Sequence, residues 1–198
     1  VPGQFGETKK KIINRLDNAE ERMLKGIEAL ESDSNALKSF RFASRAMLMQ
    51  MVHGSDDFSG KVTARNEQVY KKPDYFSSEY AGKRWYPFQL AFQLLVIESL
   101  VYTDSGDYSE TRDLVDLLWF PTGGGKTEAY LSLAAWELVY RRLEDSLKGA
   151  GTTVIKRYTL RLLTSQQFQR AGTMICALEL IRQENEQLLG KATFSLGL

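Results

Sequence analysis

The sequence predicts an α/β protein in which a helical N-terminal region, residues 1–84, precedes a domain with a parallel β-sheet, residues 85–198. Three observations carry this prediction. Apolar residues recur at helical spacing in the first region. A glycine-rich turn within residues 120–127 separates an apolar run from a helix-forming run. Strand-like and helix-like segments alternate from Asp113 onward, which favours a parallel sheet with crossover helices.

The N-terminal region is expected to form a helical hairpin followed by an irregular linker. Apolar side chains fall on one side of two segments: Ile12, Ile13, Leu16, Met23, Ile27 and Leu30 in the first, and Leu37, Phe40, Ala43, Met47 and Met51 in the second. Ser34 is a candidate N-cap for the second helix. We interpret the methionines as core residues and Lys9–Lys11 as a solvated helix face.

The linker, Gly54 to Arg84, interleaves aromatic rings with the basic pairs Lys71-Lys72 and Lys83-Arg84. Such a pattern can stack on and neutralise a single nucleic-acid strand. A surface loop that packs its rings on a neighbouring helix has the same composition, and we favour this second interpretation.

Pro87 suits the first turn of a buried helix that continues to Tyr102. Beyond it the pattern predicts three parallel strands and two further helices. The expected strands are Asp113–Trp119, Thr152–Tyr158 and Ala192–Leu196. One expected helix starts near Lys126 and runs to about Arg142 or Glu144, and the other is Leu160–Gln187.

Composition excludes several classes of function. The net charge of +1 gives no overall basic field, although a local basic groove is compatible with it. Cys176 is the single cysteine, so no internal disulfide can form; we expect it to be buried in an apolar helix and the protein to be cytoplasmic. With His53 as the only histidine, clustered His/Cys metal sites lack ligands. No apolar stretch predicts a membrane span.

The turn Phe120-Pro121-Thr122-Gly123-Gly124-Gly125-Lys126-Thr127 has the composition of a phosphate-binding loop. Glycines let backbone amides converge on one point, and the helix that follows adds its positive N-terminal end. Lys126 can reach the β- and γ-phosphates of ATP, and the Thr127 hydroxyl can bind Mg²⁺. We therefore predict that Lys126 and Thr127 are the catalytic residues, and that the cofactor-binding residues include Thr122, Gly123, Gly124, Gly125, Lys126 and Thr127. Phe120 stands where the general pattern has glycine.

Three segments in this order resemble a superfamily 2 helicase. Phe88-Gln89 resembles the upstream aromatic-glutamine element, which implies that Gln89 hydrogen-bonds adenine, although Tyr86 replaces the usual arginine. The glycine-rich turn is similar to motif I. Residues 158–167 resemble motif Ia, which implies that Thr159 and Arg161 contact the nucleic-acid backbone.

Residues 115–130 together with 157–164 resemble, more particularly, the large helicase-like subunit of DISARM, a phage-defence system that couples a helicase to DNA methylation. The resemblance implies that residues 85–198 are the first part of a RecA-like motor lobe of an ATP-dependent DNA helicase or translocase. It also implies that single-stranded DNA, or RNA, is a partner and that a further subunit of a defence complex is another.

Superfamily 2 ATPases complete their site with an Asp-Glu pair, and this chain contains no such dipeptide. We therefore expect it to be part of a longer protein and to bind nucleotide without hydrolysing it. Two alternatives remain open: another P-loop NTPase, such as a kinase or switch protein, and a non-catalytic module that docks a partner subunit through the N-terminal helices.

Overall fold

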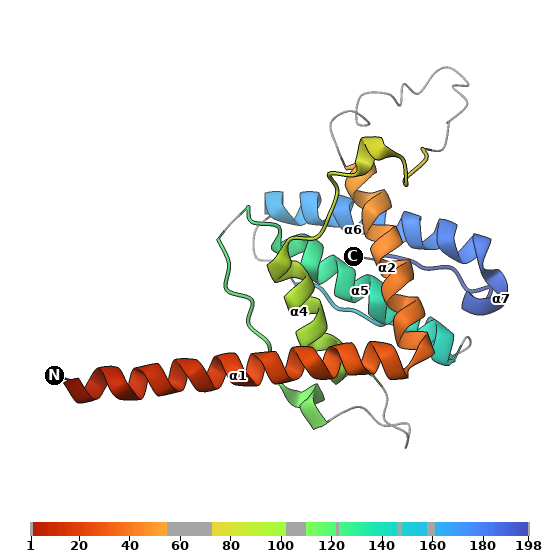
Figure 1. The fold of residues 1–198 in the computed structure, drawn as a ribbon. Coiled ribbons are helices and arrows are strands. Elements are labelled where there is room, and N and C mark those ends of the chain that lie inside the picture. Colours follow the sequence, from red (N-terminus) through yellow and green to blue (C-terminus); the bar gives the residue numbers. More distant parts are fainter. Residues whose placement is uncertain are drawn as a thin grey trace. The chain divides into compact units, whose positions relative to one another are not determined.

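The computed structural model describes residues 2–54, 73–101, 110–121, 123–145, 148–157 and 161–197, and within these ranges the chain is all-helical (Figure 1). The α-helices are α1 (Pro2–Ser32), α2 (Ser34–His53), α4 (Pro87–Ile97), α5 (Lys126–Glu144), α6 (Arg161–Glu184) and α7 (Glu186–Leu189). Short 3₁₀ helices are η1 (Ser78–Tyr80), η2 (Glu98–Leu100), η3 (Glu110–Asp113) and η4 (Lys148–Ala150).

The prediction of an α/β fold with a parallel sheet is wrong. The described residues of the three expected strands, 114–119, 152–157 and 193–196, have no regular secondary structure. A strand exists only when a neighbouring chain pairs with its amides and carbonyls, and the local pattern of these segments cannot supply that neighbour. The side chains of Val115, Leu117 and Ile155 are accordingly almost fully exposed.

The helices expected from periodicity are confirmed. The first two predicted helices appear as α1 and α2, the helix after the glycine turn as α5, and the long C-terminal helix as α6 and α7. Pro87 lies in the first turn of α4 as predicted, but α4 ends at Ile97 rather than continuing to Tyr102, and only Gln89, Gln93 and Ile97 of this helix are buried. The prediction that Cys176 is buried is wrong. Cys176 is exposed on the outer face of α6, whereas its neighbours Ile175 and Ala177 are buried.

The chain divides into two compact units, each made of two stretches. The first comprises residues 1–37 and 86–129, and the second comprises residues 38–85 and 130–198. Among the described residues no helix is both long enough and apolar enough to cross a membrane.

In the first unit the C-terminal half of α1 packs on α4 and η2. The two helices approach so closely at Gly26 that a Cβ there would lie 1.9 Å from the carbonyl oxygen of Leu94. Leu30, one turn further along, is buried. Figure 1 shows the N-terminal half of α1 extending beyond α4.

In the second unit the core consists of apolar side chains from α2, α5, α6 and α7. The fully buried members are Ala46, Met47, Val52, Leu131, Ala135, Val139, Leu178, Ile181 and Leu189. Met47 is buried, which confirms its interpretation as a core residue, whereas Met23 and Met51 are only half-buried. Arg45 of α2 forms an ion pair with Glu184 of α6 at 2.6 Å.

The C-terminal segment is held to α6 by a buried arginine and its carboxylate. Arg182 binds Glu179 through Nε at 2.9 Å and through Nη2 at 2.6 Å, and it also donates to the carbonyl oxygen of Gly190. The second carboxylate oxygen of Glu179 accepts the backbone N–H of Phe194. This network holds in place a segment that has no regular secondary structure.

The cap of α2 gives a first prediction. Asp33 Oδ1, not Ser34, accepts the N–H groups of Asn35 and Ala36, at 2.7 and 3.1 Å. We expect Asp33→Ala to lower the free energy of unfolding by about 1 kcal/mol, because it leaves helix-start amides without an acceptor. Urea unfolding followed by circular dichroism measures this change, and Ser34→Ala is the matched control. An equal loss in the two variants would contradict the assignment.

The Glu179 network gives a second prediction. The hydrogen bond from Arg182 lowers the pKa of Glu179 from 4.5 to about 2. Because the folded chain then binds this proton more weakly than the unfolded chain, the contact stabilises the fold above about pH 4.5, and its contribution is lost as the pH falls to about 2. Unfolding measured across this range should therefore be less pH-dependent in Glu179→Gln than in the control Glu20→Gln. Identical slopes would refute the network.

Candidate nucleotide-binding loop

The glycine-rich segment forms a compact turn directly before a helix. Gly123 and Gly125 have φ of +80° and +85°, a backbone region that glycine adopts without strain. Gly124 donates its N–H to the carbonyl oxygen of Pro121 at 3.2 Å. Helix α5 then begins at Lys126, so its first amides have no intrahelical partners and lie at the end of the turn. Thr122 lies outside the described residues.

Gln89 joins the start of α4 to this turn. Its Nε2 donates to the carbonyl oxygen of Gly125 at 2.7 Å, and its Oε1 accepts the backbone N–H of Tyr86 at 2.9 Å. The side chain is buried. Both polar atoms of the amide are therefore bound to the backbone, so in this arrangement Gln89 positions the loop and does not face a base.

An aromatic stack explains why Phe120 stands where the general pattern has glycine. The rings of Phe120 and Phe88 are stacked with centroids 3.9 Å apart, and the ring of Tyr86 lies parallel to Phe88 at 6.3 Å. Phe120 also covers Gly124, where a Cβ would lie 2.8 Å from its Cδ1. The two positions at which the sequence departs from the helicase pattern, Tyr86 and Phe120, thus belong to one stack with Phe88.

The ammonium group of Lys126 is hydrogen-bonded to backbone carbonyl groups of the loop. Lys126 Nζ donates to the carbonyl oxygen of Phe120 and, at 3.0 Å, to that of Pro121. The ammonium group therefore lies over the entry of the turn. Anionic oxygens placed there would accept the same hydrogen bonds and would add charge attraction that carbonyl groups lack.

Thr127 and Glu128 occupy the next two positions of α5. Thr127 is half-buried in the first turn of the helix. The carboxylate of Glu128 lies near the turn, because a Cβ on Gly125 would be 3.6 Å from its Oε2. The positive N-terminal end of the helix stabilises a carboxylate in its first turn.

The extended segment before the loop is anchored to α1 by a bidentate ion pair. Arg22 Nη1 and Nη2 lie 2.6 and 2.9 Å from the two carboxylate oxygens of Asp116. Two parallel charge-assisted hydrogen bonds fix orientation as well as distance. Sequence reasoning missed this pair, because the partners are 94 positions apart and nothing local marks either residue.

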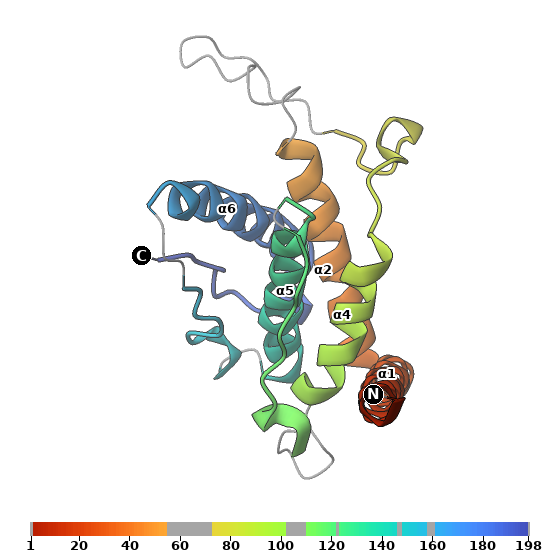
Figure 2. The ribbon, with the colours of Figure 1, turned by 90° about the vertical axis from the view of Figure 1, so that its left-hand side faces the viewer.

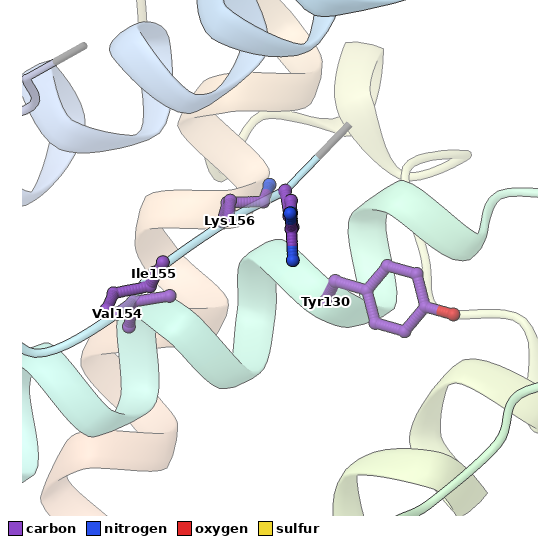
Figure 3. A pocket seen from close by; sticks show the side chains of 5 residues that line it. Tyr130, Val154, Ile155 and Lys156 are labelled. Atoms are coloured by element: carbon purple, nitrogen blue, oxygen red, sulfur yellow. The ribbon is translucent and has the colours of Figure 1, made fainter. Parts of the chain in front are cut away.

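The predicted nucleic-acid contacts are only partly described. Thr159 lies outside the described residues, and Arg161 begins α6. Just before them, Tyr130 and Val154–Arg157 line a shallow pocket of about 290 Å³ (Figure 3). Burial lowers the pKa of Lys156 in this pocket. The described residues contain no group of His, Cys, Asp and Glu side chains that could hold a metal ion.

Comparison with known proteins gives one relative. The chain is 39% identical, over 96% of its length, to the "DISARM protein DrmA" of Bacillus paralicheniformis. The chain is thus related in sequence to a DISARM protein. It spans only 16% of the length of that relative. No family model matches the chain, and no solved structure matches it.

The clamp on the loop gives a third prediction. Gly125→Ala should be more destabilising than Gly123→Ala. Both impose a left-handed backbone on alanine, at about 1–2 kcal/mol. A Cβ at Gly125 also lies 2.7 Å from Gln89 Nε2, whereas one at Gly123 meets nothing within 4 Å. The first variant therefore also loses a hydrogen bond worth about 1 kcal/mol.

Urea unfolding of the two glycine variants measures this difference. Combining each with Gln89→Ala isolates the contact, because the extra loss at Gly125 should disappear once the amide is removed. Equal destabilisation by the two glycine variants would show that Gln89 does not hold the turn.

Proposed function

We propose that this chain supplies the nucleotide-binding loop of an ATP-dependent DNA helicase or translocase that acts in bacterial anti-phage defence. The observation that carries the proposal is the turn at Gly123–Gly125, which ends at the start of α5 with Lys126 folded over it. Its relation to a DISARM protein supports the biological setting.

The residues of the turn fit a triphosphate with Mg²⁺. Two glycines hold a conformation that exposes amides, α5 adds its unpaired N–H groups, and Lys126 adds the positive charge. The space beside Gly123 is open, since a Cβ there would have no neighbour within 4 Å. The Thr127 hydroxyl, one position further along, suits Mg²⁺. Bound Mg²⁺ would neutralise charge on the phosphates.

Lys126 would exchange its carbonyl partners for phosphate oxygens. The ammonium now satisfies its hydrogen bonds at Phe120 and Pro121. Phosphate oxygens accept stronger, charge-assisted hydrogen bonds, so binding of the nucleotide would release those carbonyls and tighten the loop around the anion.

We propose for Gln89 a role different from the one that the helicase resemblance implies. Both atoms of its amide are bound to the backbone of Tyr86 and Gly125. For Gln89 to read adenine, it would have to give up at least one of these hydrogen bonds. We therefore assign it to positioning of the loop. The exposed ring of Tyr86, at the end of the aromatic stack, provides a flat surface for a base.

Contact with a nucleic-acid strand is proposed for Thr159 and Arg161, as the motif Ia resemblance implies. The position of Arg161 at the first residue of α6 supports this role, since amides at a helix start bind phosphate. The cationic side chains of Lys156 and Arg157 lie directly upstream in the sequence.

The fourth prediction concerns the lysine. In a titration with a fluorescent ATP analogue and Mg²⁺, we expect Lys126→Ala to weaken binding by about tenfold or more, because the ammonium contact with the phosphates is lost. Lys83→Ala, which removes an exposed lysine outside the loop, is the matched control. Unchanged affinity in Lys126→Ala would refute the proposed site.

Hydrolysis provides a separate test. It needs an acidic residue that orients the attacking water, and this chain contains no Asp-Glu dipeptide. We expect binding without steady turnover. Phosphate release by the chain that disappears in Lys126→Ala would contradict this expectation.

A further inference from the structure

The N-terminal half of α1 exposes an apolar face that continues a packed one. Phe5, Ile12 and Leu16 lie within about 60° of one another around the helix axis at 3.6 residues per turn. Met23 and Leu30 fall in the same sector, and Leu30 is buried where α1 packs on α4. One stripe therefore runs along the whole helix, covered at its C-terminal half and exposed at its N-terminal half. Figure 2 looks along α1 from its N-terminal end, with α4 beside it.

In the part of the chain that the structure describes, little stabilises the exposed half. Every residue from Phe5 to Asn18 is exposed, and a helical segment of this length is marginal in water without tertiary packing. Covering Phe5, Ile12 and Leu16 would remove apolar surface from water, which is favourable.

The charges beside the stripe indicate what would cover it. Lys11, Arg15 and Arg22 follow one another along the same flank, at separations of four and seven residues. Arg22 is bound by the carboxylate of Asp116. No ion pair is recorded for Lys11 or Arg15 in the described part of the chain. Carboxylates at matching positions of a second helix would repeat the Arg22–Asp116 contact further along α1.

We propose that the N-terminal half of α1 docks an amphipathic α-helix of a partner protein, whose apolar stripe covers Phe5, Ile12 and Leu16 and whose acidic flank pairs with Lys11 and Arg15. Two observations point to this occupant: the stripe continues the α1–α4 interface, and the flank is cationic. In an antiparallel second copy of α1, the cationic flanks would face each other.

The fifth prediction tests this surface with two synthetic helical peptides, each with leucines at positions a and d of about three heptads. One carries glutamate at the flanking e and g positions, and the other carries lysine. In fluorescence anisotropy with the full chain, we expect the glutamate peptide to bind about tenfold or more tightly than the lysine peptide, and its affinity to fall with salt.

Two variants on the same helix provide a matched comparison. Leu16→Glu should abolish peptide binding, whereas Leu24→Glu should leave it unchanged, because Leu16 and Leu24 are 64% and 58% exposed but Leu24 lies off the stripe. Circular dichroism verifies that both variants remain folded. Reversing the flank with Lys11→Glu and Arg15→Glu together should invert the preference between the two peptides.

Three outcomes would overturn the proposal. Equal binding of the two peptides would show that the surface does not prefer an acidic partner. Self-association of the chain in sedimentation equilibrium, lost in Leu16→Glu but not in Leu24→Glu, would assign the face to a second copy. Flotation with phosphatidylglycerol vesicles that is lost in the same variant would assign it to a membrane surface. None of these measurements involves nucleotide, so they fail or succeed independently of the phosphate-binding loop.

Discussion

The candidate nucleotide-binding loop depends on one buried amide. Gln89 binds the N–H of Tyr86 and the carbonyl oxygen of Gly125, which are separated by most of the first unit's second stretch. An amide suits this place because it offers a donor and an acceptor at the end of one side chain. A carboxylate would lose the donor and an apolar side chain would lose both, and each would leave backbone groups without partners. This one side chain therefore links the start of α4 to the turn before α5.

The aromatic stack and the lysine act on the same loop from the other side. Phe120 packs on Phe88, one position before Gln89, so the two neighbours in α4 hold opposite ends of the glycine turn. The carbonyl oxygen of Phe120 in turn accepts Lys126. The substitution of phenylalanine for a small residue thus has a structural reason, and it couples the position of the ammonium to the packing of α4.

The sequence was informative where structure is local. The periodicity of α1, α2, α5 and α6 lies within each segment, so those helices could be predicted, and so could the glycine turn that precedes α5. The β-sheet was predicted wrongly because strand formation depends on a neighbouring chain, and alternation in residues such as Val115 and Leu117 says nothing about whether one is present. Cys176 shows the same limit at a single residue, since helical spacing leaves its face ambiguous.

At the candidate site, the residue types were predictable but their partners were not. The amide of Gln89 can bind a base or a backbone, and only the structure shows which groups it reaches. The ion pair between Arg22 and Asp116 connects distant positions and therefore left no trace in local spacing.

Gly26 has a consequence for how α1 can change in length. Because the backbone of Leu94 occupies the space where a Cβ would stand, no other residue type can be moved into this position. A residue inserted or deleted between Arg22 and Gly26 would rotate the ion pair away from the crossing by about 100°. Insertions upstream of Arg22 would leave this crossing intact, but a single inserted residue would rotate the exposed N-terminal face by about 100° relative to it. The α1 helix is therefore divided into a segment whose length the crossing with α4 fixes and a segment whose length it does not fix.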